Sequence, residues 1–269
     1  MGVFAISGAA SGIGAATRNR IERAGNDVIG IDLDGCEVVA DLGSTAGRAG
    51  AVAGVLELSS GRLDGLVTAA GVGPPLDPAT IVSINYFGSQ ALLDGLRPAL
   101  TATGDAQAVA VSSNSTTVTP SVPAALVAAC LDGDEDQARA LLAERPDAGS
   151  PGAMIQAYAA SKIAIAHWVR RNAPGADWAG AGVRLNAIAP GSTLTPLLEH
   201  GLEDDTFGPL ISGFAVPTGA HAAPDEIAAW IEQMLIGDGR RFLCGTVLFV
   251  DGGTDALVRP NDWPAPYAL

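Results

Sequence analysis

Lysine is nearly absent from this 269-residue chain, which has a single one, Lys162, beside 14 arginines. Acidic residues outnumber basic ones 29 to 15, and the formal net charge at pH 7 is −14. A surface this acidic repels phosphate groups and anionic lipid headgroups. Nucleic acid and anionic membranes are therefore poor partners for this protein.

Cysteine, histidine and long apolar runs are also scarce. The three cysteines (Cys36, Cys130 and Cys244) are widely spaced and form no CxxC pair, which favours reduced thiols in a cytoplasmic protein. The three histidines lie far apart in the sequence, so we expect no metal site. No apolar run approaches the ~18 residues of a membrane helix, and no basic region precedes the first apolar segment. We therefore expect neither a membrane span nor a signal peptide.

The N-terminal stretch 3–32 carries the strongest local pattern. It consists of an apolar run, a glycine-rich turn, a helical segment and a second apolar run that ends in Asp32. Gly8, Gly12 and Gly14 permit a tight turn and close approach of a ligand, and the following helix N-terminus favours a pyrophosphate. A carboxylate at Asp32 can accept hydrogen bonds from a ribose. The pattern predicts dinucleotide binding; the alternative is an ordinary glycine-rich turn between strand and helix.

Strands and helices alternate along the rest of the chain. Further strands are expected at 37–42, 65–71, 108–113, 182–191 and 246–253, and helices at 45–58, 81–100, 156–172 and 224–236. This order predicts an α/β fold of one domain, 1–269: a Rossmann-type doubly wound parallel sheet of about seven strands, with ligands at the carboxyl ends of its strands.

Three segments depart from the alternation. Residues 114–153 form an insert before the helix at 156–172, with short helices expected at 122–131 and 135–144, and we interpret it as a solvated hairpin. Residues 192–220 are loop-rich and apolar, and are expected to border the substrate. The proline-rich tail 260–269 is expected to be extended and to pack on the surface.

The solitary lysine stands four residues after Tyr158, one of three tyrosines. On a helix these two side chains share a face. A neighbouring ammonium favours the phenolate, which lowers the phenol pKa from about 10 towards neutrality. Tyr158 would then serve as a general acid/base, and the compact ammonium of Lys162 can also reach ribose hydroxyls. The alternative is an ordinary surface pair on a helix.

Two polar residues precede this helix in the sequence. Ser113 ends the strand at 108–113, where its hydroxyl can hydrogen-bond a substrate carbonyl or alcohol oxygen. Asn85 lies in the helix at 81–100, where its amide can hold a water beside Lys162 or simply kink the helix. Asp41 and Leu42 end the strand at 37–42 and can hold an adenine ring, although a surface aspartate is an equal alternative.

Together these residues resemble the short-chain dehydrogenase/reductase family over essentially the whole chain. The glycine motif is SGAASGIG (7–14), the active-site motif is YAASK (158–162), and the nicotinamide-side segment is NAIAPGSTLTP (186–196). The resemblance implies that Ser113, Tyr158 and Lys162 are catalytic, with Asn85 as a fourth member. It also implies cofactor contacts by Ser7, Gly8, Ser11, Gly12, Ile13, Gly14, Asp32, Leu33, Asp41, Leu42, Ala70, Gly71, Tyr158, Lys162, Ile188, Pro190, Gly191, Thr193 and Thr195.

Two features depart from the family pattern. The usual NNAG is TAAG at 68–71, so an asparagine that steadies the central strand is missing, and the spacing from Ser113 to Tyr158 is much longer than usual. Within the family the long insert, GIDLDG, NYFG and the tail with Arg259-Pro260 are most similar to the bacterial 3α-hydroxysteroid dehydrogenase/carbonyl reductase type.

The positions of acidic and basic residues predict the cofactor and the substrate. Asp32 would repel a 2′-phosphate, and residues 9–11 and 33–36 include no Arg or Lys, so NAD(H) is preferred over NADP(H). No basic residue lies between Arg184 and Arg240, so we expect an uncharged, apolar (alicyclic or steroid-like) secondary alcohol or ketone. The alternative function is a catalytically silent NAD(H)-binding regulatory protein. The family commonly pairs its long helices across subunits, and because the insert can obstruct that contact we expect a homodimer.

Overall fold

The computed structural model describes residues 1–263, and the last six residues of the predicted tail lie outside the described part. Seven parallel strands form one sheet in the order β3-β2-β1-β4-β5-β6-β7. Their bounds are β1 Val3–Ser7, β2 Asp27–Asp32, β3 Val38–Val39, β4 Gly65–Thr68, β5 Gln107–Val111, β6 Arg184–Pro190 and β7 Val247–Val250. The strand order reverses between β1 and β4, and this confirms the predicted doubly wound α/β fold.

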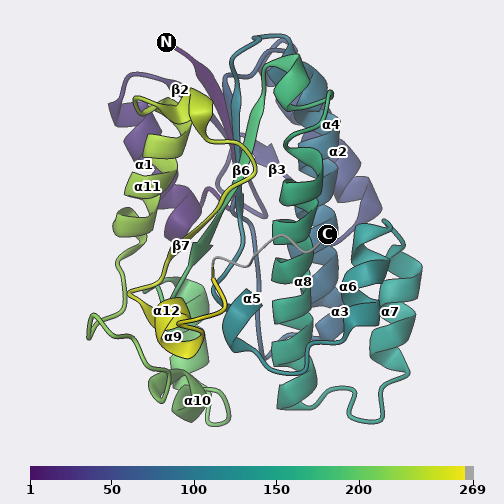
Figure 1. Cartoon of the computed structure of the whole chain (residues 1–269). Helices are drawn as coiled ribbons and strands as arrows, with labels where there is room; N and C mark the ends of the chain where they lie inside the picture. Colours follow the sequence, from purple (N-terminus) through teal and green to yellow (C-terminus); the bar gives the residue numbers. More distant parts are fainter. Residues whose placement is uncertain (264–269) are drawn as a thin grey trace, which may run out of the picture.

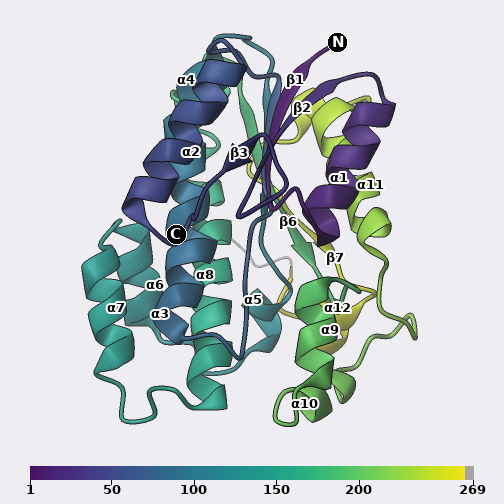
Figure 2. The same cartoon turned by 180° about the vertical axis from the view of Figure 1, so that it is seen from behind.

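Helices cover both faces of the sheet (Figures 1 and 2). On one face α1 (Gly12–Arg23) packs against α11 (Pro224–Ile236), and on the other lie α2 (Thr45–Leu58), α4 (Ser89–Thr101) and α8 (Pro151–Asn172). The shorter elements are α3 Pro78–Val82, α5 Ser115–Val118, α6 Ala124–Leu131, α7 Glu135–Ala143, α9 Pro196–Glu203, α10 Gly208–Ser212 and α12 Thr254–Val258. A π-helix, η1, spans Ser83–Gly88, and two 3-10 turns are η2 Ala179–Ala181 and η3 Arg240–Phe242.

Side chains of the central strands alternate between two cores. Ile6, Val67 and Val109 point towards α1 and α11, while Ala5, Leu66 and Ala108 point towards α2, α4 and α8. A strand buried on both faces needs apolar residues at successive positions. This is why the central strands appear in the sequence as continuous apolar runs.

Most predicted elements are confirmed, with differences at their ends. The third strand is shorter than 37–42, and the helix expected at 81–100 begins at Pro78 and passes through η1 before α4. The Tyr/Lys helix begins at Pro151, not at 156, because the Ser150 hydroxyl caps it by accepting from Ala153 N at 3.1 Å. Residues 192–220 contain the helices α9 and α10, which the loop prediction missed, and α5 and α12 were also unexpected.

The insert forms the predicted pair of helices, but it is not merely a solvated hairpin. Helix α6 packs against α8, and α7 packs against α6 and α3 (Figure 1). Leu126 and Cys130 of α6 and Leu142 of α7 are buried in the same core as α4 and α8. The insert therefore extends the hydrophobic core on one face of the sheet.

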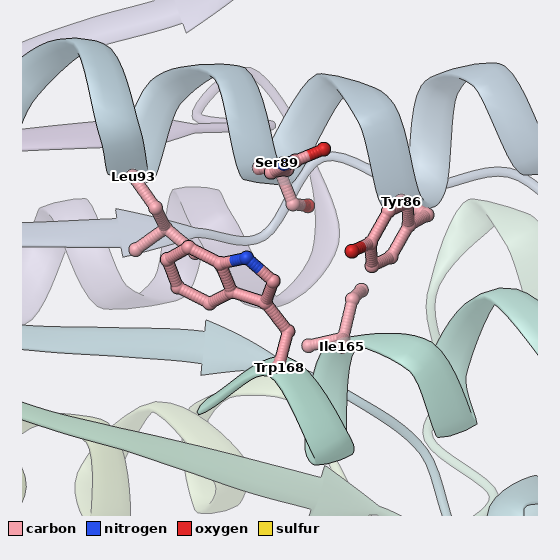
Figure 3. A pocket seen from close by; sticks show the side chains of 6 residues that line it. Tyr86, Ser89, Leu93, Ile165 and Trp168 are labelled. Atoms are coloured by element: carbon pink, nitrogen blue, oxygen red, sulfur yellow. The ribbon is translucent and has the colours of Figure 1, made fainter. Parts of the chain in front are cut away.

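A small hollow lies between the η1–α4 stretch and α8 (Figure 3). It is lined by Tyr86, Ser89, Gln90, Leu93, Ile165 and Trp168. The Tyr86 hydroxyl is directed into this hollow and has no hydrogen-bond partner within residues 1–263, and burial raises its pKa. Tyr86 is thus a neutral packing residue.

Because Leu126 of the insert is 1% exposed, replacing it with alanine should lower the free energy of unfolding by about 2–5 kcal/mol. The matched control is Leu58→Ala at the end of α2, where the leucine is 55% exposed and the change should cost less than about 0.5 kcal/mol. Chemical denaturation measures both. Equal losses for the two variants would contradict a core role for the insert.

Candidate active site

A cleft of about 970 Å³ opens at the carboxyl ends of the strands, where the doubly wound fold places ligands. Most of the predicted site residues line it, although they come from distant parts of the chain. They are Gly8, Ser11, Gly12, Ile13, Gly14, Asp32, Leu33, Asp41, Leu42, Ala70, Gly71, Ser113, Tyr158, Lys162, Pro190, Gly191, Thr193 and Thr195. The parallel sheet brings these residues together because every strand ends at the same edge.

Three predicted residues lie behind the cleft wall instead of lining it. Ser7 is buried, and its hydroxyl accepts a hydrogen bond from Ala70 N at 3.1 Å. Asn85 and Ile188 are fully buried. The Ser7 and Ile188 side chains support the wall from within, and the cofactor contacts that the family resemblance implies for these two residues stay predictions.

The glycine loop between β1 and α1 forms one end of the cleft. Gly8 has a φ of +70°, which favours glycine, and a side chain at Gly14 would collide with the Gly8 carbonyl oxygen. This close packing sets the first turn of α1, from Gly12 onward, against the cleft. Unpaired N–H groups at a helix N-terminus suit an anion such as a pyrophosphate. The loop therefore fits a dinucleotide.

The Asp32 carboxylate stands at the end of β2. Its Oδ2 accepts from Ala10 N at 3.0 Å and its Oδ1 from Leu33 N at 2.8 Å. The nearby Arg18 is engaged by Glu22 at 2.8 Å and by Glu37 at 2.7 Å. This end of the cleft thus presents the Asp32 carboxylate, while the guanidinium of Arg18 lies outside the cleft lining and is already paired, which is a poor setting for a 2′-phosphate.

Lys162 and Tyr158 lie side by side on α8, as their spacing predicted. The Lys162 Nζ atom is 5.8 Å from the centroid of the Tyr158 ring and donates a hydrogen bond to the Val111 carbonyl oxygen at 3.0 Å. Val111 ends β5, and two residues later the Ser113 hydroxyl is within hydrogen-bonding reach of the Tyr158 phenol. The end of β5 and one face of α8 therefore form a compact group of hydroxyl, phenol and ammonium.

Burial has the largest effect on the pKa values of Tyr158 and Lys162. It raises the pKa of the Tyr158 phenol, and the hydrogen bond with Ser113 opposes that rise without cancelling it. Burial also lowers the pKa of the Lys162 ammonium, which is 4% exposed, to about 8. The predicted lowering of the Tyr158 pKa by Lys162 is not found in this structure, because burial raises that pKa and Lys162 is not among the groups that shift it.

Asn85 sits in the π-helical segment η1, where its amide reaches the loop after β4. Its Oδ1 accepts from Val72 N at 2.8 Å, and its Nδ2 donates to Val72 O at 2.9 Å and to Ser161 Oγ at 3.2 Å. A Cβ at Gly71 would lie 3.3 Å from Asn85 Oδ1 and 3.4 Å from Lys162 Nζ. The amide and the ammonium thus flank Gly71, while the helix around Asn85 departs from α geometry.

The outer part of the cleft is apolar. Helices α9 and α10 and the residues that flank α10 line it with apolar side chains of the predicted substrate segment: Leu197, Leu198, Phe207, Leu210, Ile211 and Phe214. Among the cleft-lining residues of the described chain, the ionisable side chains are Asp32, Asp41, Tyr158, Lys162 and His200, and none is arginine. An uncharged ligand suits this part of the cleft better than an anion.

The sequence analysis missed several lining residues near Tyr158. Val118 and Thr119 of the insert line the cleft at the end of α5, and Ile155 lines it one turn before Tyr158 on α8. Ile155 was detectable, because positions three residues apart share a helix face. Val118 and Thr119 were not, since nothing local shows that the start of the insert returns to the cleft.

Residues 1–263 contain no group of three or more His, Cys, Asp or Glu side chains placed to hold a metal ion. Among the helices of this range, none combines the length and hydrophobicity that a bilayer crossing requires.

Comparisons with known proteins agree with this geometry. A family model described as enoyl-(acyl carrier protein) reductase matches residues 146–255. The chain is 42% identical to the 3-alpha-hydroxysteroid dehydrogenase/carbonyl reductase of Comamonas testosteroni, over 98% of this chain and 100% of the relative. It is 29% identical to the cis-4-hydroxycyclohexanecarboxylate dehydrogenase of Sinomonas cyclohexanicum, over 95% and 97% of the two chains.

A solved structure of a related dehydrogenase also matches this chain over nearly its full length. The 3-alpha-hydroxysteroid dehydrogenase of Pseudomonas sp. B-0831, crystallised with NADH, matches with a TM-score of 0.89 and 44% identity, over 97% of this chain and 100% of that one. Similarity of this extent over the full length goes beyond a shared fold. The protein belongs to the short-chain dehydrogenase/reductase family.

Proposed function

We propose that this protein is an NAD(H)-dependent dehydrogenase that interconverts a secondary alcohol and a ketone on an uncharged alicyclic or steroid-like substrate. One observation carries the proposal: Ser113, Tyr158 and Lys162 converge in the same cleft as the glycine loop and Asp32. Two relatives that resemble the chain over their whole length are dehydrogenases of a hydroxysteroid and of a hydroxycyclohexane carboxylate.

The residues present fit NAD(H). The glycine loop offers N–H groups for the pyrophosphate, and Asp32 offers acceptors for the adenosine ribose. Asp41 and Leu42 would border the adenine, and Pro190, Gly191, Thr193 and Thr195 the nicotinamide. When bound, the cofactor would supply the chemistry of hydride transfer at its nicotinamide ring.

The proton chemistry belongs to the chain's own side chains. Tyr158 takes the hydroxyl proton of the alcohol during oxidation and returns it during reduction. Ser113 donates a hydrogen bond to the substrate oxygen and keeps it beside the phenol. Lys162 holds its ammonium below the phenol through the Val111 carbonyl and donates to ribose hydroxyls. Asn85 holds the Val72 backbone and thereby the loop beside Lys162.

The substrate class follows from the apolar wall of α9 and α10. Phosphorylated and coenzyme-A substrates need cations to offset their charge, and no arginine lines the described cleft. A flat ring system can pack against leucine and phenylalanine side chains. The site does not favour the alternative, a catalytically silent NAD(H)-binding regulatory protein, because a protein that only binds NAD(H) does not need a buried lysine beside a phenol.

We also propose a cytoplasmic homodimer. Cys36, Cys130 and Cys244 are all free, as suits a reducing compartment. The edge strand β7 is apolar and only half-buried along its whole length, and nearby in the chain Phe242 is 99% exposed. Such an edge is suited to contact with a second copy.

Replacing Tyr158 with phenylalanine should lower kcat by about 10²–10⁴-fold or more, because the proton donor and acceptor is lost. NADH binding should be largely unchanged, since the ring remains. Oxidation of NADH with a panel of alicyclic ketones, followed by absorbance, measures the first effect and fluorescence titration the second. Tyr86→Phe, which removes a hydroxyl without a partner in the described chain, is the matched control and should retain activity. A Tyr158→Phe variant with wild-type turnover would refute the assigned role.

The enzyme should bind NADH at least about tenfold more tightly than NADPH, because Asp32 repels the 2′-phosphate. Asp32→Asn should narrow this ratio, and low salt should widen it in the wild type. Asp34→Asn, an exposed acid outside the cleft lining, is the control and should leave the ratio unchanged. Tighter binding of NADPH by the wild type would overturn the assignment.

The homodimer can be tested by sedimentation. The protein should sediment with the mass of two chains at micromolar concentration, and Phe242→Asp should shift it towards the monomer because a charge would be buried against the partner. A tetramer, or a dimer unaffected by this change and by charges on β7, would contradict the proposed contact.

A further inference from the structure

The insert carries a carboxylate, Glu135, that is linked to the cofactor cleft through a buried arginine. Glu135 is the first residue of α7, where its charge also suits the helix N-terminus. Its Oε1 and Oε2 accept from Arg48 at 2.8 and 2.7 Å. Arg48 belongs to α2, 87 residues earlier in the chain, so the pair joins the insert to a helix that is distant in sequence.

Arg48 connects this carboxylate to the adenine end of the cleft. The guanidinium is 8% exposed, and it donates from Nε to Leu42 O at 2.9 Å and from Nη2 to Gly43 O at 3.2 Å. Leu42 lines the cleft, and the adjacent Asp41 holds the same turn by accepting from Gly43 N at 2.8 Å. The planar guanidinium of Arg48 thus donates to Glu135 and also to these two carbonyl oxygens. This leaves the loop at residues 42–43 little freedom to move.

A second connection runs from the insert to the π-helix η1. Ser83, its first residue, is buried and accepts from Arg139 Nη1 at 2.8 Å. Arg139 lies four residues after Glu135 on α7, and its charge acts on the Glu135 carboxyl. Two residues later in η1, Asn85 clamps Val72, and its partner Ser161 donates to the Tyr158 carbonyl at 2.7 Å.

The charge on Glu135 is retained at neutral pH. Burial alone would raise the pKa of its carboxyl, but the hydrogen bonds from Arg48 and Ser83 and the charges of Arg48 and Arg139 outweigh burial and lower it. The carboxylate thus stays anionic where it must balance a nearly buried guanidinium. Of the cleft-lining residues, this network uses Leu42 through its backbone carbonyl.

We propose that Glu135 is a positioning residue with two arms: through Arg48 it holds the adenine-side loop, and through Arg139, which donates to Ser83, it holds the π-helical segment that carries Asn85. The inference rests on the proposed function, because the two held segments would face the two ends of a bound dinucleotide. The insert then acts on the reaction from outside the cleft. Its hydrogen bonds, and not its bulk alone, set the cofactor site.

Glu135→Gln tests the shared carboxylate. It should weaken binding of NADH and of ADP-ribose by roughly tenfold or more, the cost of losing a charge-assisted pair, and it should also lower kcat at saturating cofactor. The control is Asp147→Asn, which breaks the Arg145–Asp147 pair elsewhere in the insert and should change neither quantity. Unchanged affinity for both ligands in Glu135→Gln would overturn the proposal.

A double variant separates positioning from simple stability. Arg48→Met with Glu135→Leu removes both charges, so no buried charge is left unpaired and the melting temperature should recover relative to Glu135→Gln. ADP-ribose binding should stay weak, because Leu42 O and Gly43 O still lack their donor. Recovery of binding together with stability would show a merely structural pair and refute the adenine-side arm. If Glu135→Gln does not fold, this variant carries the test of that arm.

Ser83→Ala tests the second arm. It should lower kcat while leaving ADP-ribose affinity at the wild-type value, because the adenine-side loop keeps its contacts. A wild-type kcat, or a loss of ADP-ribose affinity equal to that of Glu135→Gln, would contradict two separable arms. Failure of wild-type protein to bind either NADH or ADP-ribose would instead refute the proposed function.

Discussion

A buried ammonium is the constraint on which the rest of this site depends. Lys162 is 4% exposed, and burial lowers its pKa to about 8, so the fold holds a cation where a cation is unfavourable. The Val111 carbonyl at the end of β5 gives it a hydrogen-bond acceptor, and the Tyr158 ring lies beside it. Such a residue lowers stability and is retained for what it does at the site.

The parallel sheet determines where this ammonium can act. Because all seven strands run in the same direction, β1, β2, β4, β5 and β6 deliver their following residues to one edge. The glycine loop, Asp32 and Ser113 arrive there from separate βα units, while α8 brings Tyr158 and Lys162 alongside β5. A cleft with polar groups on the cofactor side and leucine and phenylalanine on the other side results from this topology together with α9 and α10.

The insert shows how an addition outside the sheet becomes part of the site. Its helices bury Leu126 and Leu142 against α8 and its neighbours, and α7 is tied to Arg48 through Glu135 and to Ser83 through Arg139. The packing of the two leucines is apolar and tolerates small shifts, whereas the hydrogen bonds of α7 are directional. The apolar contact keeps the insert in place, and the directional contacts hold two cofactor-side segments relative to each other.

The sequence alone was sufficient for the doubly wound fold, the glycine loop, Asp32 and the Tyr158–Lys162 pair, because each depends on local spacing: apolar runs of strand length, glycines at a turn, and a shared helix face. It could not establish that Ser7 and Ile188 support the cleft from behind, that Val118 and Thr119 line it, or that Glu135 meets Arg48 across 87 residues. It also gave the wrong direction for the Tyr158 pKa. Burial and long-range contacts are properties of the packed chain, and only the tertiary structure decides which groups lose water and which charges they meet.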